Sequence, residues 1–257
     1  MHPHPFDRLL SIMDELREKC PWDRAQTMES IRHLSIEEVY ELSEAILAKD
    51  NTAICTELGD LLLHIVFYSK IASEQKVFDI WQVIDRLCEK LIRRHPHIYG
   101  QVQAETPQRV KENWEQIKLK ESANKKVLQG VPKGLPAMIK AYRIQEKVAS
   151  VGFDWEKAEH VLEKVIEEAQ ELRKEIQQNP ASKERIENEL GDLFFSLVNV
   201  ARFLGINPED ALEKTNQKFM RRFNYIEDQL HQANLSFAQA HLAMLDALWE
   251  EAKKAEY

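Results

Sequence analysis

Glycine and cysteine are scarce in this chain of 257 residues, which contains only seven glycines and three cysteines. The glycine-rich phosphate loops GxxxxGK[ST] and GxGxxG are both absent, so a phosphate site would have to be built from side chains and metal. Cys20, Cys55 and Cys88 are odd in number and lack the spacing of metal ligands. We therefore expect reduced thiols in a cytoplasmic protein.

Long uncharged runs and a basic excess are missing as well. No apolar run reaches the length of about 18 residues that a membrane helix needs, and MHPHPFDRLL at the start lacks the pattern of a signal peptide. The net charge is -8, with charged residues at 30% and no strong basic block. This balance argues against a partner that is a nucleic-acid polymer or a membrane. A small cation or a metal-bound anion suits the chain better.

Strict alternation of apolar and polar residues, which is typical of strands, does not occur over any convincing length. Leu, Glu, Lys, Ala and Gln instead fill the segments between prolines, which is the composition of a helical protein. We predict an all-α fold. Breaks at Asn179-Pro180 and at 205–208 divide the second half of the chain. The helices expected there cover about 137–150, 156–178, 183–204, 208–232 and 237–255.

The chain reads as two tandem copies of one domain. Four patterns occur twice in the same order, at offsets between 128 and 135 residues: EExxEL at 37–42 and 167–172, ELGDL at 57–61 and 189–193, KxxRR at 90–94 and 218–222, and a Trp-Glu pair at 114–115 and 249–250. Charge, glycine and proline interrupt the periodicity at 121–136, as in a linker. We predict domains at 1–120 and 137–257, each of four or five helices.

Acidic residues at helical spacing are the main candidate site. Glu168 and Glu171 share one helix face, as do Glu189 and Asp192 on the next helix. If these helices pack antiparallel, four carboxylates converge, and a divalent cation offsets their repulsion. A solvated acidic face is the common alternative, but the second pair lies in an apolar helix and both pairs are repeated. The matching first-copy residues form a second candidate set: Glu38, Glu41, Glu57 and Asp60.

The metal expected from these ligands is Mg²⁺, with Mn²⁺ as a possible substitute. Di-iron bundles place Glu-x-x-His on two helices. Here the pairs are Glu-x-x-Glu and Glu-x-x-Asp, and ligation by oxygen alone favours Mg²⁺ or Mn²⁺ over iron.

A basic cluster follows each acidic set. Lys218, Arg221 and Arg222 lie at spacing i, i+3, i+4, which suits binding of a polyphosphate beside a metal. Surface charges paired with nearby acids are the alternative. In the first copy Pro96 follows the arginines closely and is expected to end that helix, so the second cluster should be more firmly positioned. Trp249 is expected to be a packing residue or to stack on a base.

Taken together, these motifs resemble the MazG family of nucleoside triphosphate pyrophosphohydrolases. The resemblance covers almost the whole chain and includes four further segments: CPWD at 20–23, RRHPH at 93–97, WEQIK at 114–118 and VGFDW at 151–155. It implies an all-α homodimer whose helices pack into bundles across the subunit interface. It also implies Mg²⁺-dependent cleavage of NTPs and dNTPs, ATP among them, to the monophosphate and pyrophosphate.

The resemblance also implies roles for single residues of the second copy. The metal ligands would be Glu168, Glu171, Glu189 and Asp192, and one of these or Glu167 would orient the attacking water. Nucleotide contacts would come from Lys164 to Glu168, from Arg185 or Ile186 to Glu189, from Lys218 to Arg222 including Arg221, and from Trp249. The second domain is therefore the main catalytic candidate.

Other functions remain compatible with the residues themselves. The first domain could be a second active site or a degraded copy that supports the dimer. A non-catalytic regulatory module that binds metal or nucleotide would carry the same acids, and so would a redox di-metal bundle.

Overall fold

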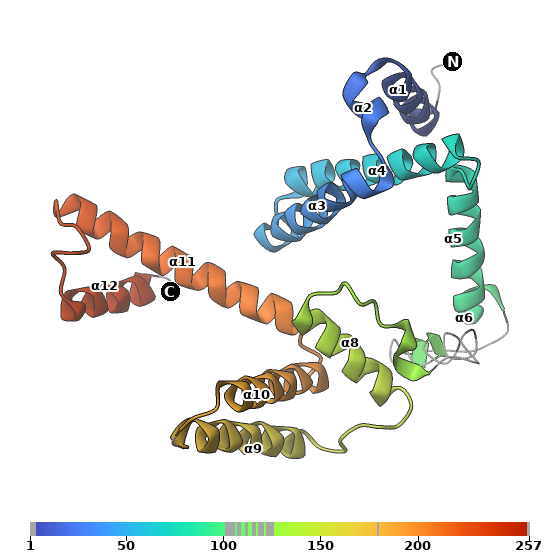
Figure 1. Ribbon diagram of the computed structural model, residues 1–257. Coiled ribbons are helices and arrows are strands. Elements are labelled where there is room, and N and C mark those ends of the chain that lie inside the picture. Colours follow the sequence, from blue (N-terminus) through green and yellow to red (C-terminus); the bar gives the residue numbers. More distant parts are fainter. Residues whose placement is uncertain are drawn as a thin grey trace. The chain divides into compact units, whose positions relative to one another are not determined.

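The computed structural model describes residues 4–100, 126–178 and 180–255, together with 106, 109–110, 113–114, 117 and 121. Part of the predicted linker, 122–125, lies outside the described residues. The chain divides into two compact units, Met1–Trp114 and Glu115–Tyr257, which contain the first and second copies. The described part of the chain contains helices and no strand, which confirms the all-α prediction (Figure 1). No described helix is long and apolar enough to cross a membrane.

Unit 1 is built around a pair of antiparallel helices, α3 and α4. Lys49 ends α3 in the left-handed conformation with φ of 57°, and the Asp50 side chain accepts hydrogen bonds from the first amides of α4. This two-residue connection reverses the chain within one turn. The helices of this unit are α1 Pro5–Lys19, α2 Pro21–Ala25, α3 Met28–Ala48, α4 Asn51–Glu74, α5 Ile80–Arg94 and α6 Pro96–Tyr99.

The apolar core of unit 1 forms where α1 lies on the α3–α4 pair. Its buried members are Met13, Ile31, Val66, Phe67, Ile71 and Ile80. Helix α5 ends at Arg94, and Pro96 follows as the first residue of α6, as expected from the sequence.

Unit 2 repeats the antiparallel pair as α9 and α10, with α8 packed against α10 and α12 against α11. Its elements are the 3₁₀ turn η1 Val127–Gly130 and the helices α8 Ala137–Ala149, α9 Ala158–Gln177, α10 Lys183–Phe203, α11 Pro208–Gln232 and α12 Leu242–Ala255. Most predicted boundaries lie within two residues of these. The start predicted at 237 is wrong, because Gln239 accepts hydrogen bonds from the Ser236 amide and hydroxyl and holds a turn there.

Arg17 joins three segments of unit 1. Its guanidinium pairs with Glu74 at 2.6 Å and also donates to the backbone carbonyls of Asp23 and Gln26. Only 9% of the Arg17 side chain is exposed. One cation therefore fixes the ends of α1, α2 and α4 relative to one another.

Replacing Arg17 should destabilise unit 1. We expect Arg17→Met to lower the free energy of unfolding by about 2 kcal/mol, because two carbonyls and a carboxylate lose their donor. Urea denaturation followed by circular dichroism measures this loss. Lys19→Met is the matched control, since Lys19 and Glu15 form a pair that is 66% and 69% exposed. Equal stability of the two variants would contradict the role given to Arg17.

Candidate functional site

The α9–α10 pair brings three of the four predicted acids of unit 2 together. One carboxylate oxygen each of Glu168, Glu189 and Asp192 lies within 4.8 Å of the others. Glu168 comes from α9 and the other two from α10, so the cluster exists only when the helices pack. Glu171 is not part of this group, but its charge acts on Glu189.

The carboxylates of this unit 2 cluster repel one another. Partial burial and then the negative charges of Glu171, Asp192 and Glu168 raise the pKa of Glu189 above its usual value. Every charge that shifts this pKa comes from a carboxylate of α9 or α10. A divalent cation would relieve that repulsion.

Lys164 lies beside the acids and partly offsets their charge. Its Nζ is 2.6 Å from Glu168 and 3.0 Å from Glu167. The hydrogen bond to Glu168, followed by that to Glu167, raises the pKa of Lys164. Glu168 itself is buried, so its charge needs this partner or a metal. The side chain of Glu167 is 56% exposed.

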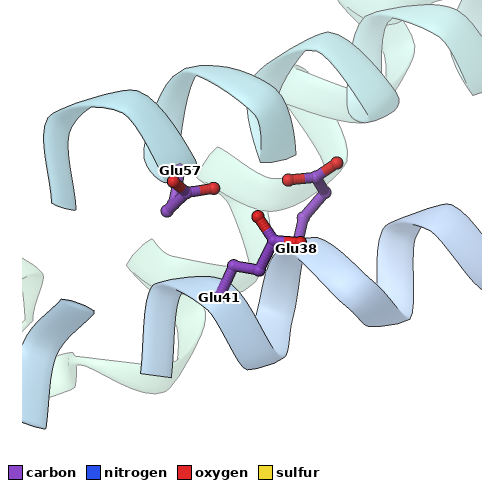
Figure 2. Close-up of side chains that lie close together, drawn as sticks. All are labelled: Glu38, Glu41 and Glu57. Atoms are coloured by element: carbon purple, nitrogen blue, oxygen red, sulfur yellow. The ribbon is translucent and has the colours of Figure 1, made fainter. Parts of the chain in front are cut away.

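Unit 1 contains the corresponding cluster. Figure 2 shows Glu38 and Glu41 on α3 and Glu57 on α4, and their carboxylate oxygens approach within 4.8 Å. Asp60 lies outside this group, yet its charge contributes to the raised pKa of Glu38, after partial burial. The two clusters omit different members of the predicted quartets, so each site has a fourth carboxylate nearby.

Both clusters fit a hard divalent cation. Carboxylate oxygens from two facing helices are the donors that Mg²⁺ and Mn²⁺ prefer. The repulsion among these acids would be balanced by such an ion. His64, one turn after Asp60, is buried in unit 1, and burial lowers its pKa. Ser196 takes its place in unit 2, so histidine is not a shared feature of the two sites.

A cavity of about 610 Å³ opens beside the acids of unit 2. Glu168, Asp192 and Lys164 are among the residues that line it. The remaining walls come from α8, the loop before α9, and α10, and they include Ile144, Gln145, Val148, Phe153, Trp155, Phe195 and Asn199. A mostly apolar hollow with a few polar groups, next to a cluster of carboxylates, has the character of a ligand site.

An ion pair holds the loop that walls this cavity. Arg202 on α10 donates to both carboxylate oxygens of Asp154, and Asp154 accepts from the Trp155 amide. Only 10% of the Arg202 side chain is exposed. Phe153 and Trp155 thus belong to a loop that is fixed at Asp154, while their rings remain accessible.

Most residues that line the cavity were not predicted from the sequence. The VGFDW segment marked Phe153 and Trp155, but only as part of a family motif. Gln145, Phe195 and Asn199 carried no signal, because their roles depend on how α8 packs against α10. Ile186, predicted as a nucleotide contact, is half-buried on α10 and is absent from the cavity wall.

The basic cluster of α11 lies in a different setting. α11 packs mainly on α12 and α8. The Arg222 guanidinium is 5.4 Å from the centre of the Trp249 ring, and Phe219 is 5.1 Å from the same ring. Unit 1 repeats the contact, with Arg94 at 5.9 Å from Trp114. Trp249 therefore packs on α11, and its expected stacking on a base stays a prediction.

Comparison with known proteins identifies relatives along the whole chain. The MazG nucleotide pyrophosphohydrolase domain matches residues 26–99 and again residues 156–226. A nucleoside triphosphate pyrophosphohydrolase of Escherichia coli K12 is 40% identical, with 98% of each chain covered. The Thermotoga maritima protein named nucleoside triphosphate pyrophosphohydrolase/pyrophosphatase MazG is 44% identical over 96% of this chain and 95% of its own.

A longer protein also contains a similar segment. YabN of Bacillus subtilis is 43% identical over 98% of this chain, which corresponds to 52% of YabN. Both domain matches include an acidic cluster described above: Glu38, Glu41 and Glu57 in the first, and Glu168, Glu189 and Asp192 in the second. The chain therefore belongs to the MazG nucleotide pyrophosphohydrolase family and carries its domain twice.

Proposed function

We propose that this protein is a Mg²⁺-dependent hydrolase that cleaves nucleoside triphosphates to the monophosphate and pyrophosphate. The observation that carries the proposal is the cavity of unit 2, whose lining includes the carboxylates Glu168 and Asp192. A nucleoside placed in the cavity would present its phosphates to the acidic cluster. The similarity to the Escherichia coli and Thermotoga maritima proteins, both named as nucleoside triphosphate pyrophosphohydrolases, supports this proposal.

We assign the reaction to unit 2 because apolar residues occupy two of the matching positions in unit 1. The offset of 130 residues between Glu38 and Glu168 relates Leu34 to Lys164. The offset of 132 between Glu57 and Glu189 relates Phe67 to the cavity residue Asn199. Phe67 is a core residue of unit 1 and Leu34 packs against that core. Unit 1 thus keeps the acids, but core side chains stand at two positions that line the cavity in unit 2.

Mg²⁺, which Mn²⁺ could replace, would be held by Glu168, Glu171, Glu189 and Asp192. When bound, it would neutralise charge on the phosphate oxygens during the displacement. The acids otherwise repel one another, so the chain is built to need a cation at this point.

The side chains around the acids would bind the nucleoside and the phosphates and orient the attacking water. The cavity would hold the nucleoside and orient the α-phosphorus toward the cluster. Lys164, once released from Glu168, would donate to phosphate oxygens. Glu167 lies outside the cluster, pairs with Lys164 and is 56% exposed, so it would orient the attacking water and accept its proton. Pyrophosphate then leaves, and its charge needs further cations.

We propose that those cations come from a second copy of the chain in a homodimer. Lys218, Arg221 and Arg222 lie on α11, which packs mainly on α12 and α8, whereas the acids lie on α9 and α10. The α9–α10 pair exposes large apolar side chains that a partner would cover: Leu162, Ile166, Leu190, Phe194 and Leu197, each at least 39% exposed. Patches of this kind mark protein interfaces.

The three cysteines are free, which agrees with a cytoplasmic location.

Activity should depend on the acids of unit 2. We expect Glu189→Gln to lower kcat for NTP hydrolysis at least about 100-fold, because the metal loses a ligand. The matched variant Glu57→Gln should stay within about threefold of wild type. Chromatography of nucleotide and pyrophosphate products with Mg²⁺ measures both. Loss of activity in Glu57→Gln alone would move the site to unit 1.

Removing one acid should stabilise the metal-free protein. Since Glu189 has a raised pKa in the folded state, its charge at neutral pH disfavours folding. We expect Glu189→Gln to raise the thermal midpoint in EDTA and to reduce the further rise that Mg²⁺ causes. Glu184→Gln, an exposed acid in the first turn of α10, should produce neither effect. A lower midpoint for Glu189→Gln in EDTA would be evidence against repulsion among the acids.

Sharing of sites between copies can be tested by complementation. Glu189→Gln chains are refolded together with chains carrying Lys218→Ala and Arg221→Ala. Half of the dimers are then mixed and each holds one intact site, so about a quarter of the wild-type rate should return. If the cations act within their own chain, mixing restores nothing.

A further inference from the structure

The loop between α8 and α9 starts from a fixed helix end. The Phe153 amide donates to the Val148 carbonyl at 3.0 Å and closes the last turn of α8. Gly152 has a φ of 88°, in the left-handed region that residues with a side chain rarely adopt. The chain therefore leaves α8 at a defined residue, and residues 152–155 line the cavity.

The other end of this loop is held differently. Helix α9 begins at Ala158, and its N-cap Lys157 makes no side-chain capping bond within the described part of the chain. The loop is instead tied to α10 through Asp154, whose two carboxylate oxygens accept from Arg202. Asp154 also accepts from the Trp155 amide at 2.9 Å. The ion pair and the course of the backbone at Trp155 are therefore linked.

Arg202 is suited to hold a loop in one position. Its guanidinium pairs with both carboxylate oxygens of Asp154, and its Nε donates to Asn199 Oδ1 at 3.0 Å. Only 10% of the Arg202 side chain and 29% of the Asp154 side chain are exposed. Bidentate arginine–carboxylate pairs fix direction as well as distance. A displaced loop would leave a largely buried guanidinium without its carboxylate, which is costly.

Unit 1 has a different contact at the matching position. The offset of 132 residues relates Lys70 of α4 to Arg202, and Lys70 pairs with Asp14 of α1 at 2.7 Å. The segment before α3 is held by Arg17 through backbone carbonyls. The ion pair between α10 and its loop therefore distinguishes the unit in which we place the reaction.

The loop brings two aromatic side chains to the cavity. Phe153 and Trp155 both line it, and they are 79% and 44% exposed. The Trp155 ring lies 6.3 Å from the ring of His160 on α9. Exposed aromatic rings at an apolar cavity offer stacking surfaces to a planar base of any kind. Glu168 and Asp192 line the same cavity, so base and phosphates have separate groups to bind.

We propose that Arg202 is a positioning residue that holds the loop 151–155 through Asp154 and so sets how tightly the enzyme binds the nucleoside part of its substrate. Trp155 provides the stacking surface, and Arg202 acts on the nucleoside through the loop. The inference rests on the proposed function, because it names the residues that bind the nucleoside of the proposed substrate.

The positioning role affects binding rather than the chemical step. Asp154 is not a member of the acidic cluster, so loss of the ion pair removes none of the clustered carboxylates. A contact to the nucleoside is made equally in the bound substrate and in the transition state. Its loss therefore raises KM and leaves kcat nearly unchanged.

Steady-state kinetics with ATP and Mg²⁺ test this role. We expect Asp154→Asn and Arg202→Met each to raise KM about tenfold, with kcat within about threefold of wild type. Trp155→Leu should have the same effect, because the base loses its stacking surface, and Trp155→Phe should keep most of the affinity. Trp22→Leu and Arg86→Met change exposed residues of unit 1 and are the matched controls. They should alter neither constant.

Equilibrium dialysis separates the nucleoside from the phosphates. The probes are α,β-methylene-ATP, which is not cleaved at the α–β bond, and pyrophosphate, each with Mg²⁺. Arg202→Met should raise the Kd of the analogue about tenfold and leave that of pyrophosphate unchanged. Combining Arg202→Met with Trp155→Leu should weaken binding of the analogue no further, because both changes remove the same contact. Independent contacts would instead give a loss of about 100-fold.

Each result decides for or against the positioning role. A lower kcat with unchanged KM and Kd in Arg202→Met means that Arg202 only stabilises the fold, which overturns the proposal. Equal weakening of both probes overturns it as well, since Arg202 would then act on the phosphate end. Where Arg202→Met does not fold, Asp154→Asn and Trp155→Leu decide by the same measurements. If wild type releases no AMP from ATP, the proposed function fails, while the Kd values of the two probes still decide the role of Arg202.

Discussion

Repulsion between carboxylates across a helix pair is the constraint on which each unit depends. Glu168 faces Glu189 and Asp192 from the opposite helix, and the apolar packing of α9 on α10 holds them there. Folding thus brings together carboxylates that repel one another, and a bound cation would offset this repulsion. The same conflict recurs between α3 and α4, so it belongs to the repeated domain rather than to one site.

The helices and the acids could be predicted because both depend on local sequence. Proline and glycine mark most helix ends, and spacing i, i+3 sets which acids share a face. The turn before α12 has no such marker, since Gln239 forms it through a side-chain bond. Which acids meet within 4.8 Å also depends on side-chain positions, so each predicted quartet appears as a triad with a fourth carboxylate nearby.

The cavity could not be predicted, because its parts meet only in the folded unit. Gln145 contacts a carbonyl 50 residues away, and Arg202 reaches Asp154 over 48 residues. Helical periodicity shows that such residues lie on a face, but not which neighbour that face meets. The packing of Arg222 on the Trp249 ring likewise joins two helices and could not be predicted from the spacing of the basic residues.

In the acidic cluster of unit 2, the Lys164 ammonium already pairs with Glu168, so it would compete with a metal ion for that carboxylate. A cation bound there would have to share Glu168 with Lys164 or displace it, whereas the corresponding Leu34 of unit 1 carries no charge. The acidic clusters of the two units share a sequence pattern but differ in charge, because among the described residues only the unit 2 cluster has a lysine beside it. A cation that displaced Lys164 would free its ammonium beside the cavity, and binding of the cation would then be coupled to binding of an anionic ligand.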